Sequence, residues 1–346
     1  MASFFAPLWG RDESSKVGAL CQCVPSNLCA DNDAAVNGQG LFDIRVDKTC
    51  PNFEICCENH IPELSLPNVP ATYSGCGYQN PIRVNPRIMS DSKYAEYGEL
   101  PWTVVILVRD IAKTDRNMYK CGGSLIHPQV VLTAAHCLLN KKVFKVRAGE
   151  WNTKSKEEPF PHQDRSVLEA LLHPNFHSGS LRNDIALLFL TDPLIFHVNI
   201  GLICLPPQHL QLEEAVCTVG GWGKDHLKKG KYSAILKKVN LPLVSKEKCV
   251  AALRKTRLGA FYKFHKSFIC AGGESNKDTC KGDGGSPLVC LIPDGKDRFF
   301  QAGIVSWGIG CGENDVPGVY ANVALFSEWI DDELNVRNFD NSFYKY

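Results

Sequence analysis

The sequence predicts an all-β fold for most of this 346-residue chain, ending in a helix and preceded by a small disulfide-rich domain. Three observations support this prediction. Short apolar and β-branched runs alternate with turn residues after Pro101, six cysteines fall within residues 21–57, and five prolines lie between residues 58 and 87. A chain of this length is expected to hold two or three domains, and its hydrophobic fraction of 44% is ample for a packed core.

The cysteines define the first domain. About 40 residues bury too little apolar surface to fold unaided, so crosslinks must supply the stability. Six cysteines allow about 15 pairings, and spacing alone does not choose among them. Zinc-binding thiols are the alternative, but only Cys56-Cys57 with His60 approaches a metal-ligand spacing. The total of sixteen cysteines, an even number, favours disulfides and a secreted protein. The six are Cys21, Cys23, Cys29, Cys50, Cys56 and Cys57.

The prolines predict an extended, semi-rigid linker, because proline fixes φ and removes a hydrogen-bond donor. Cys76 lies within this linker and is expected to tie it to the larger domain. The predicted boundaries are an N-terminal extension at 1–16, the small domain at 17–58, the linker at 59–87, the large domain at 88–334 and a tail at 335–346.

The large domain alternates short apolar runs with Gly, Pro and Asn loops, a pattern typical of a β-barrel or β-sandwich. The clearest runs are Trp102–Val108, Val130–Thr133, Val143–Arg147, Ile185–Leu190 and Gly303–Trp307. Helical spacing of Leu325, Trp329 and Ile330 predicts a helix from about Val323 to Leu334. For the tail that follows, the sequence leaves a loose and a docked arrangement open.

Charge and hydropathy exclude two function classes. The formal net charge is only +1, so no global field draws the chain to nucleic acid. No stretch approaches the roughly 20 apolar residues that a membrane span needs. We therefore expect neither a nucleic-acid nor a membrane partner.

Three segments carry the groups of serine-type acyl transfer, which needs a nucleophile, an imidazole base, an orienting carboxylate and amide donors for the oxyanion. Thr133-Ala-Ala-His-Cys137 places His136 after an apolar strand, and Asn183-Asp-Ile-Ala-Leu187 places Asp184 before another. The turn Cys280-Lys-Gly-Asp-Gly-Gly-Ser-Pro287 offers the N–H groups of Gly282 and Gly284 for an oxyanion hole.

These motifs, with Gly221-Trp-Gly223 and Ser306-Trp-Gly308, resemble those of the trypsin/chymotrypsin-like serine proteases over residues 88–334. The resemblance implies two six-stranded β-barrels with the site between them and a C-terminal helix. It also implies the disulfides Cys76–Cys204, Cys121–Cys137, Cys217–Cys290, Cys249–Cys270 and Cys280–Cys311. The N-terminal cysteine spacing resembles an arthropod clip domain, which implies the pairs Cys21–Cys56, Cys23–Cys50 and Cys29–Cys57.

The departure from that family is Gly284, which stands where the family has the serine nucleophile. Glycine has no side chain to attack a carbonyl. Ser286 is two residues away, about 6 Å along the chain, whereas the contact between nucleophile and base tolerates only about 2.6–3.2 Å. A laboratory substitution would replace serine by alanine and keep its neighbours, so the displaced serine favours a natural pseudo-protease.

The activation region departs too. Pro86-Arg87-Ile88 resembles the cleavage site that frees an isoleucine ammonium, which in the family pairs with the carboxylate matching Asp283. Met89-Ser90-Asp91 replaces the flexible glycines that let this terminus insert. Three basic residues in predicted loops are candidates for cleavage: Arg45, Arg83 and Arg87.

Two further sites follow from the resemblance. Asp278, with Gly308 and Gly318 as pocket walls, matches the position that recognises Lys or Arg, and the alternative is a blocked relic. The segment 150–158 resembles the family's calcium loop. Calcium prefers hard oxygen ligands, which the carboxylates of Glu150 and Glu158 and the carbonyls of Asn152 and Ser155 could supply; the alternative is a plain surface loop.

Charge is distributed unevenly along the chain. Residues 224–266 carry thirteen Lys and Arg against two acidic residues, whereas residues 11–63 carry nine acidic residues against four basic ones. Solvated loops without a role are one interpretation. The other is a basic face that receives an acidic partner, such as another molecule's N-terminal domain in a self-assembled oligomer.

The combination of domains closely resembles the insect clip-domain serine protease homologues. This resemblance implies a secreted haemolymph protein that is cut by an upstream protease. It also implies a non-catalytic cofactor role beside prophenoloxidase and its activating clip-domain proteases, in melanization and innate immunity. The alternatives are a pattern-recognition or adhesion protein that binds microbial polysaccharide, and a weakly active trypsin-like protease.

Overall fold

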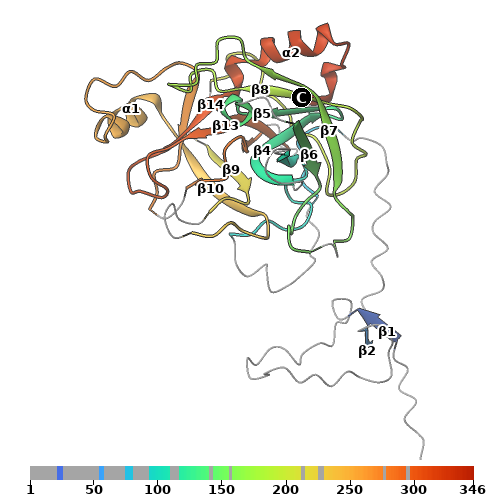
Figure 1. Ribbon diagram of the computed structural model, residues 1–346. Helices are drawn as coiled ribbons and strands as arrows, with labels where there is room; N and C mark the ends of the chain where they lie inside the picture. Colours follow the sequence, from blue (N-terminus) through green and yellow to red (C-terminus); the bar gives the residue numbers. More distant parts are fainter. Residues whose placement is uncertain are drawn as a thin grey trace, which may run out of the picture. The chain divides into compact units, whose positions relative to one another are not determined.

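A computed structural model describes residues 22–25, 54–57, 75–80, 93–109, 117–139, 143–155, 158–211, 215–224, 230–275, 278–293 and 297–346. The chain divides into two units, Met1–Val69 and Pro70–Tyr346 (Figure 1). In the first unit, β1 (Gln22–Pro25) pairs antiparallel with β2 (Glu54–Cys57) and brings Cys23 opposite Cys56. Each of the three disulfides expected in this unit includes a cysteine outside the described residues, namely Cys21, Cys50 or Cys29. The cleavage candidates Arg45, Arg83 and Arg87 also lie outside the described residues.

The second unit contains two closed six-stranded barrels, as the resemblance implied. The strands of the first barrel follow one another in the order β3-β4-β5-β8-β7-β6. They are β3 (Thr103–Arg109), β4 (Asn117–His127), β5 (Val130–Thr133), β6 (Val143–Ala148), β7 (Gln163–Leu172) and β8 (Ala186–Leu190). Every residue of β5 and β8 is buried, which explains why these strands are continuous apolar runs in the sequence.

The second barrel runs in the order β10-β11-β14-β13-β12-β9. Its strands are β9 (Val216–Gly221), β10 (Lys237–Val244), β11 (Phe268–Ala271), β12 (Pro287–Leu291), β13 (Phe299–Trp307) and β14 (Gly318–Asn322). Closure of both barrels removes free sheet edges and packs the inward side chains into one continuous apolar core.

In the described part of the barrel unit, two α-helices flank the barrels (Figure 1). α1 (Lys246–Arg254) begins at Ser245, whose side chain accepts a hydrogen bond from the N–H of Lys248, and it buries Cys249 and Leu253. The C-terminal helix expected from Val323 is interrupted. A 3-10 turn at Val323–Leu325 comes first, and α2 (Ser327–Val336) follows. No helix among the described residues is both long and apolar enough to cross a membrane.

The C-terminal tail is docked, the arrangement that the sequence left open. A last 3-10 turn at Asn341–Tyr344 buries the Tyr344 ring, and the Tyr344 hydroxyl donates to Asp331 of α2 at 2.5 Å. The N–H of Leu205 donates to the Tyr344 carbonyl at 2.9 Å. The tail is therefore part of the barrel unit.

Five disulfides crosslink this unit and match the pairs that the resemblance implied. Cys76, in the predicted linker, is bonded to Cys204 and so ties that segment to the barrels. The others are Cys121–Cys137, Cys217–Cys290, Cys249–Cys270 and Cys280–Cys311.

Candidate functional site

The imidazole and the carboxylate expected from the motifs meet between the two barrels. His136 lies on a 3-10 turn, Ala135–Leu138, directly after β5, and Asp184 lies just before β8. Because β5 and β8 pair side by side, the two residues are adjacent. The Nδ1 of His136 is 2.7 Å from Asp184 Oδ2, and the His136 backbone N–H donates to Asp184 Oδ1 at 2.8 Å.

Asp184 is completely buried and has a third partner, which the sequence reasoning missed. The Ser306 hydroxyl, on β13 of the second barrel, donates to Asp184 Oδ2 at 2.5 Å. The Ser306-Trp-Gly308 motif signalled this position without giving its role. A fully hydrogen-bonded carboxylate fixes the orientation of His136 and turns its Nε2 away from Asp184.

That Nε2 atom faces Gly284. A Cβ built on Gly284 would lie only 2.9 Å from His136 Nε2, so the imidazole occupies space that a side chain at position 284 would need. Ser286 points elsewhere. It is fully buried, its Oγ has no hydrogen-bond partner among the described residues, and it packs against Gly122 of β4. Neither residue presents a hydroxyl to His136.

The glycine-rich turn is anchored by the buried carboxylate of Asp283. Its Oδ1 accepts the N–H of Gly223 at 2.8 Å, and its Oδ2 accepts the N–H of Cys280 at 2.9 Å. Burial raises the pKa of Asp283 above its usual value, although the two backbone hydrogen bonds and, to a smaller degree, the charge of Lys237 oppose this rise. Backbone donors and a lysine thus surround the carboxylate that, in the family, meets an isoleucine ammonium.

Asp283 also explains the Gly-Trp-Gly motif. A Cβ on Gly221 or on Gly223 would come within 2.2 or 2.3 Å of the Asp283 carboxylate oxygens. Both positions must therefore be glycine if the carboxylate is to reach the backbone between them.

The predicted oxyanion turn is overlaid by aromatic side chains. The Tyr119 hydroxyl donates to the Gly282 carbonyl at 2.6 Å. The Tyr232 ring lies so close that a Cβ on Gly282, where φ is +110°, would meet it at 2.7 Å. These two tyrosines had no signal in the sequence, because each lies on a segment distant from the turn.

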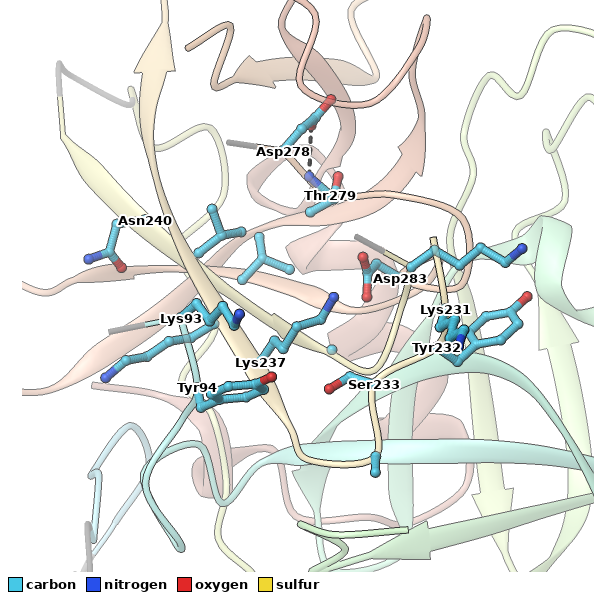
Figure 2. A pocket seen from close by; sticks show the side chains of 16 residues that line it. Lys93, Tyr94, Lys231, Tyr232, Ser233, Lys237, Asn240, Asp278, Thr279 and Asp283 are labelled. Atoms are coloured by element: carbon cyan, nitrogen blue, oxygen red, sulfur yellow. Dashed lines mark hydrogen bonds between the residues drawn. The ribbon is translucent and has the colours of Figure 1, made fainter. Parts of the chain in front are cut away.

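Asp278 opens into a cavity of about 920 Å³ that also contains Asp283 (Figure 2). Its carboxylate accepts N–H groups from Thr279 at 2.8 Å and Gly312 at 3.1 Å. Burial raises its pKa to about 6. The two glycines predicted as pocket walls, Gly308 and Gly318, do not line this cavity. Gly318 is nevertheless close to Asp278, because a Cβ built on it would lie 3.2 Å from Asp278 Oδ1.

The predicted calcium loop brings its two carboxylates together. Glu150, Glu158 and His162 place ligand atoms within 4.8 Å of one another. Glu150 Oε1 is buried without a hydrogen-bond partner among the described residues, while Oε2 accepts from Arg147 at 3.1 Å. Burial and, to a smaller degree, the Glu150 charge raise the pKa of Glu158. A cation would give Glu150 Oε1 a partner and would favour the charged form of Glu158, so the two carboxylates fit a hard metal ion.

The carbonyl ligands fit less directly. The Asn152 carbonyl accepts the N–H of Ser155 at 2.9 Å, which leaves one of its lone pairs for a metal. The Asn152 side-chain oxygen accepts the N–H of Lys154 at 3.2 Å. His162 was not among the predicted ligands, and its Nδ1 atom lies 3.6 Å from Glu150 Oε2.

Comparison with known proteins agrees with this geometry. Residues 90–330 match the family described as "Trypsin", and residues 11–58 match the one described as "Serine protease Clip domain PPAF-2". The chain therefore belongs to the trypsin family and carries a clip domain.

Several insect proteins are similar over most of the chain. "Phenoloxidase-activating factor 2" of Galleria mellonella is 49% identical over 282 residues, which are 79% of this chain and 93% of that protein. "Inactive CLIP domain-containing serine protease A8" of Anopheles gambiae is 37% identical over 89% of this chain and 87% of its own length. "Inactive CLIP domain-containing serine protease A3" of Aedes aegypti is 37% identical over 95% of this chain and 70% of its own length.

Proposed function

We propose that this chain is a secreted, non-catalytic member of its family that acts as a cofactor when prophenoloxidase is activated by clip-domain proteases. The observation that carries the proposal is that His136 Nε2 faces Gly284. The site therefore has a base but no nucleophilic side chain beside it. The names of the Galleria and Anopheles relatives support the pathway and the loss of catalysis respectively.

The size of the catalytic loss supports a binding role. In subtilisin, removal of the serine costs about 2 × 10⁶ in kcat. His136 could still activate water slowly, but Ser286 is packed against Gly122 and gives no second nucleophile. What remains of the protease is a rigid, crosslinked surface.

Limited proteolysis is the proposed trigger, at Arg83, Arg87 or Arg45 in the sequence. The cut chain then engages prophenoloxidase and its activating protease, or assembles with further copies of itself. Sedimentation that remains monomeric at every concentration, before and after the cut, would exclude the self-assembly step.

A reconstitution tests the cofactor role. The purified chain, cut and uncut, is added to prophenoloxidase and its activating protease, and phenoloxidase output is measured. We expect higher output with the cut chain and no effect of a bystander protein of equal concentration. Equal output with the bystander contradicts the proposal. Separately, hydrolysis of an arginyl substrate or acylation by an organophosphate would show that the chain is an active protease.

We also propose a structural calcium ion held by Glu150 and Glu158, with the backbone carbonyls of Asn152 and Ser155. The ion would supply positive charge to the buried Glu150 Oε1, for which the described part of the chain offers no hydrogen-bond partner. Saturation at about 100 times the Kd would stabilise the fold by about 2.7 kcal/mol.

A thermal unfolding titration with CaCl₂ measures this effect. We expect the Tm of the parent chain to rise and that of Glu158→Gln to stay constant. A matched loss of one exposed carboxylate, Asp192→Asn, should leave the calcium response intact. Equal responses of the parent and Glu158→Gln would contradict the site.

A further inference from the structure

The cavity beside Asp283 has a lining that neither peptide hydrolysis nor its loss explains. Lysines from three separate segments converge on it, from the chain before β3, from the stretch between β9 and β10, and from the start of β10 (Figure 2). They are Lys93, Lys224, Lys231, Lys237 and Lys238. Five lysines and two aspartates line the cavity, and one of the lysines, Lys238, is paired with Glu99 beside the lining. This leaves an excess of two positive charges at one cavity of a chain whose net charge is +1.

The two aspartates do not cancel this charge at the mouth. Each accepts two backbone N–H groups, Asp283 from Gly223 and Cys280, and Asp278 from Thr279 and Gly312. Asp283 is only 8% exposed. Lys237 extends toward it (Figure 2) and its charge lowers the Asp283 pKa. The carboxylates are therefore bonded to the backbone inside the cavity, whereas the side chains of Lys93 and Lys231 are exposed.

Aromatic rings hold two of the lysines in place. Lys224 Nζ lies 5.4 Å from the centre of the Tyr232 ring, and Lys93 Nζ lies 5.1 Å from the centre of the Tyr94 ring. Such contacts restrict the ammonium groups before a ligand arrives. Both tyrosines also line the cavity, and their rings offer an apolar face beside polar groups.

The kinds of donor select the chemistry of the ligand. Arginine is favoured where carboxylates or phosphates are bound through planar pairs of hydrogen bonds, whereas lysine binds phosphate as a point charge. None of the described residues that line the cavity is an arginine. Lysine ammonium groups are compact point charges with three rotatable donors. Ser233, Asn240 and Thr279 add uncharged hydrogen-bonding groups. This combination suits the tetrahedral oxyanions and hydroxyl groups of a charged sugar chain better than it suits an acidic peptide.

We propose that this lysine-lined cavity is a binding site for a glycan chain that bears sulfate or phosphate groups. The site does not depend on the cofactor role, since it requires neither cleavage nor prophenoloxidase. Its volume of about 920 Å³ lies within the usual range of ligand pockets, about 300–1,000 Å³.

Binding of heparin and of teichoic acid tests the proposal and distinguishes sulfated from phosphate-bearing sources. Kd values would be measured for the full chain between 50 and 200 mM NaCl. The variant Lys224→Ala/Lys231→Ala should bind at least one of the two probes about tenfold more weakly. The logarithm of its affinity should also depend less steeply on salt, because fewer counterions are released.

Two further variants and one competitor keep the test decisive. Lys255→Ala/Arg257→Ala removes the same charge from exposed positions outside the cavity and should bind like the parent. Lys224→Arg/Lys231→Arg keeps the charge and should retain most of the affinity. Thermal unfolding verifies that each variant is folded. Equal losses in the two alanine variants, no loss in either, or poly-glutamate binding as tightly as the better glycan would each overturn the proposal.

Discussion

At the level of single residues, short contacts around His136 determine the geometry of the site. His136 is held by Asp184 at 2.7 Å, and Asp184 in turn is held by Ser306, so the imidazole has little freedom to move. Gly284 is the residue that leaves room for the ring in this position. The position of the imidazole therefore depends on the absence of a side chain at residue 284.

Gly284→Ala tests that interpretation. The new methyl would meet His136 Nε2 at about 2.9 Å, and overpacking of this kind typically costs about 1–3 kcal/mol. We expect the Tm to fall by about 2–4 °C per kcal/mol of lost stability. In a double-mutant cycle with His136→Ala, the cost of Gly284→Ala should largely disappear, because the clashing ring is gone. Additive effects of the two substitutions would show that the imidazole is not what limits position 284.

Asp278 gives the stability of the fold a dependence on pH. Burial raises the pKa of its carboxyl to about 6, against about 3.9 in an unfolded chain. Between these values the folded state binds more protons, so this group stabilises the fold as pH falls from about 6 to about 4. At about 1.4 kcal/mol per pKa unit, the change is of the order of 3 kcal/mol.

The comparison of the parent chain with Asp278→Asn isolates this titration, since other groups cancel in the difference. The unfolding free energy of the parent, relative to the variant, should increase as pH is lowered from 7 to 4. A difference that stays constant, or that moves in the opposite direction, would mean that Asp278 has an ordinary pKa in the folded chain.

At the level of elements, local pattern predicted the strands that are buried on both faces. Every residue of β5 and β8 is buried, all but Thr133 are apolar, and both strands lie where the sequence placed them. α1 was missed because it buries little besides Cys249 and Leu253, and its charged surface resembles a loop. β7 was missed because most of its residues are partly or fully exposed, which leaves no apolar period.

The same reasoning explains what was predicted of the site. His136, Asp184 and Gly284 were recognisable because each lies within a short motif at a strand end. Tyr119, Tyr232 and Ser306 come from distant segments, and only barrel closure brings them to the turn or to Asp184. Contacts of that kind depend on register and packing, which no local pattern encodes.

The docked tail is an element whose contribution is measurable. Tyr344 is 2% exposed, and its hydroxyl donates to Asp331. Tyr344→Phe should cost about 1 kcal/mol, the usual net value of one hydrogen bond. Tyr344→Ala should cost about 3–5 kcal/mol, as for other large aromatic truncations. Urea unfolding of both variants provides the measurement, and losses below about 0.5 kcal/mol in Tyr344→Ala would contradict a docked tail.

For the whole molecule, the disulfide between Cys76 and Cys204 decides what limited proteolysis does. The bond joins residues 128 positions apart, and the segment between them contains the cleavage candidates Arg83 and Arg87. A cut after Arg83 or Arg87 therefore breaks the backbone without separating the two pieces. The N-terminal piece then remains at a high effective concentration beside the barrels instead of diffusing away.

Electrophoresis of the cut protein tests this consequence. Without reductant we expect one band at the full mass, and with reductant two bands, the smaller one ending at whichever arginine was cut. In Cys76→Ser/Cys204→Ser, a cut after Arg83 or Arg87 should release the N-terminal piece without reductant. Because the link acts by tethering, this variant should also lose cofactor activity after the cut while keeping its folded barrels. Release of the piece from the parent chain without reductant would show that the bond does not hold the cut molecule together.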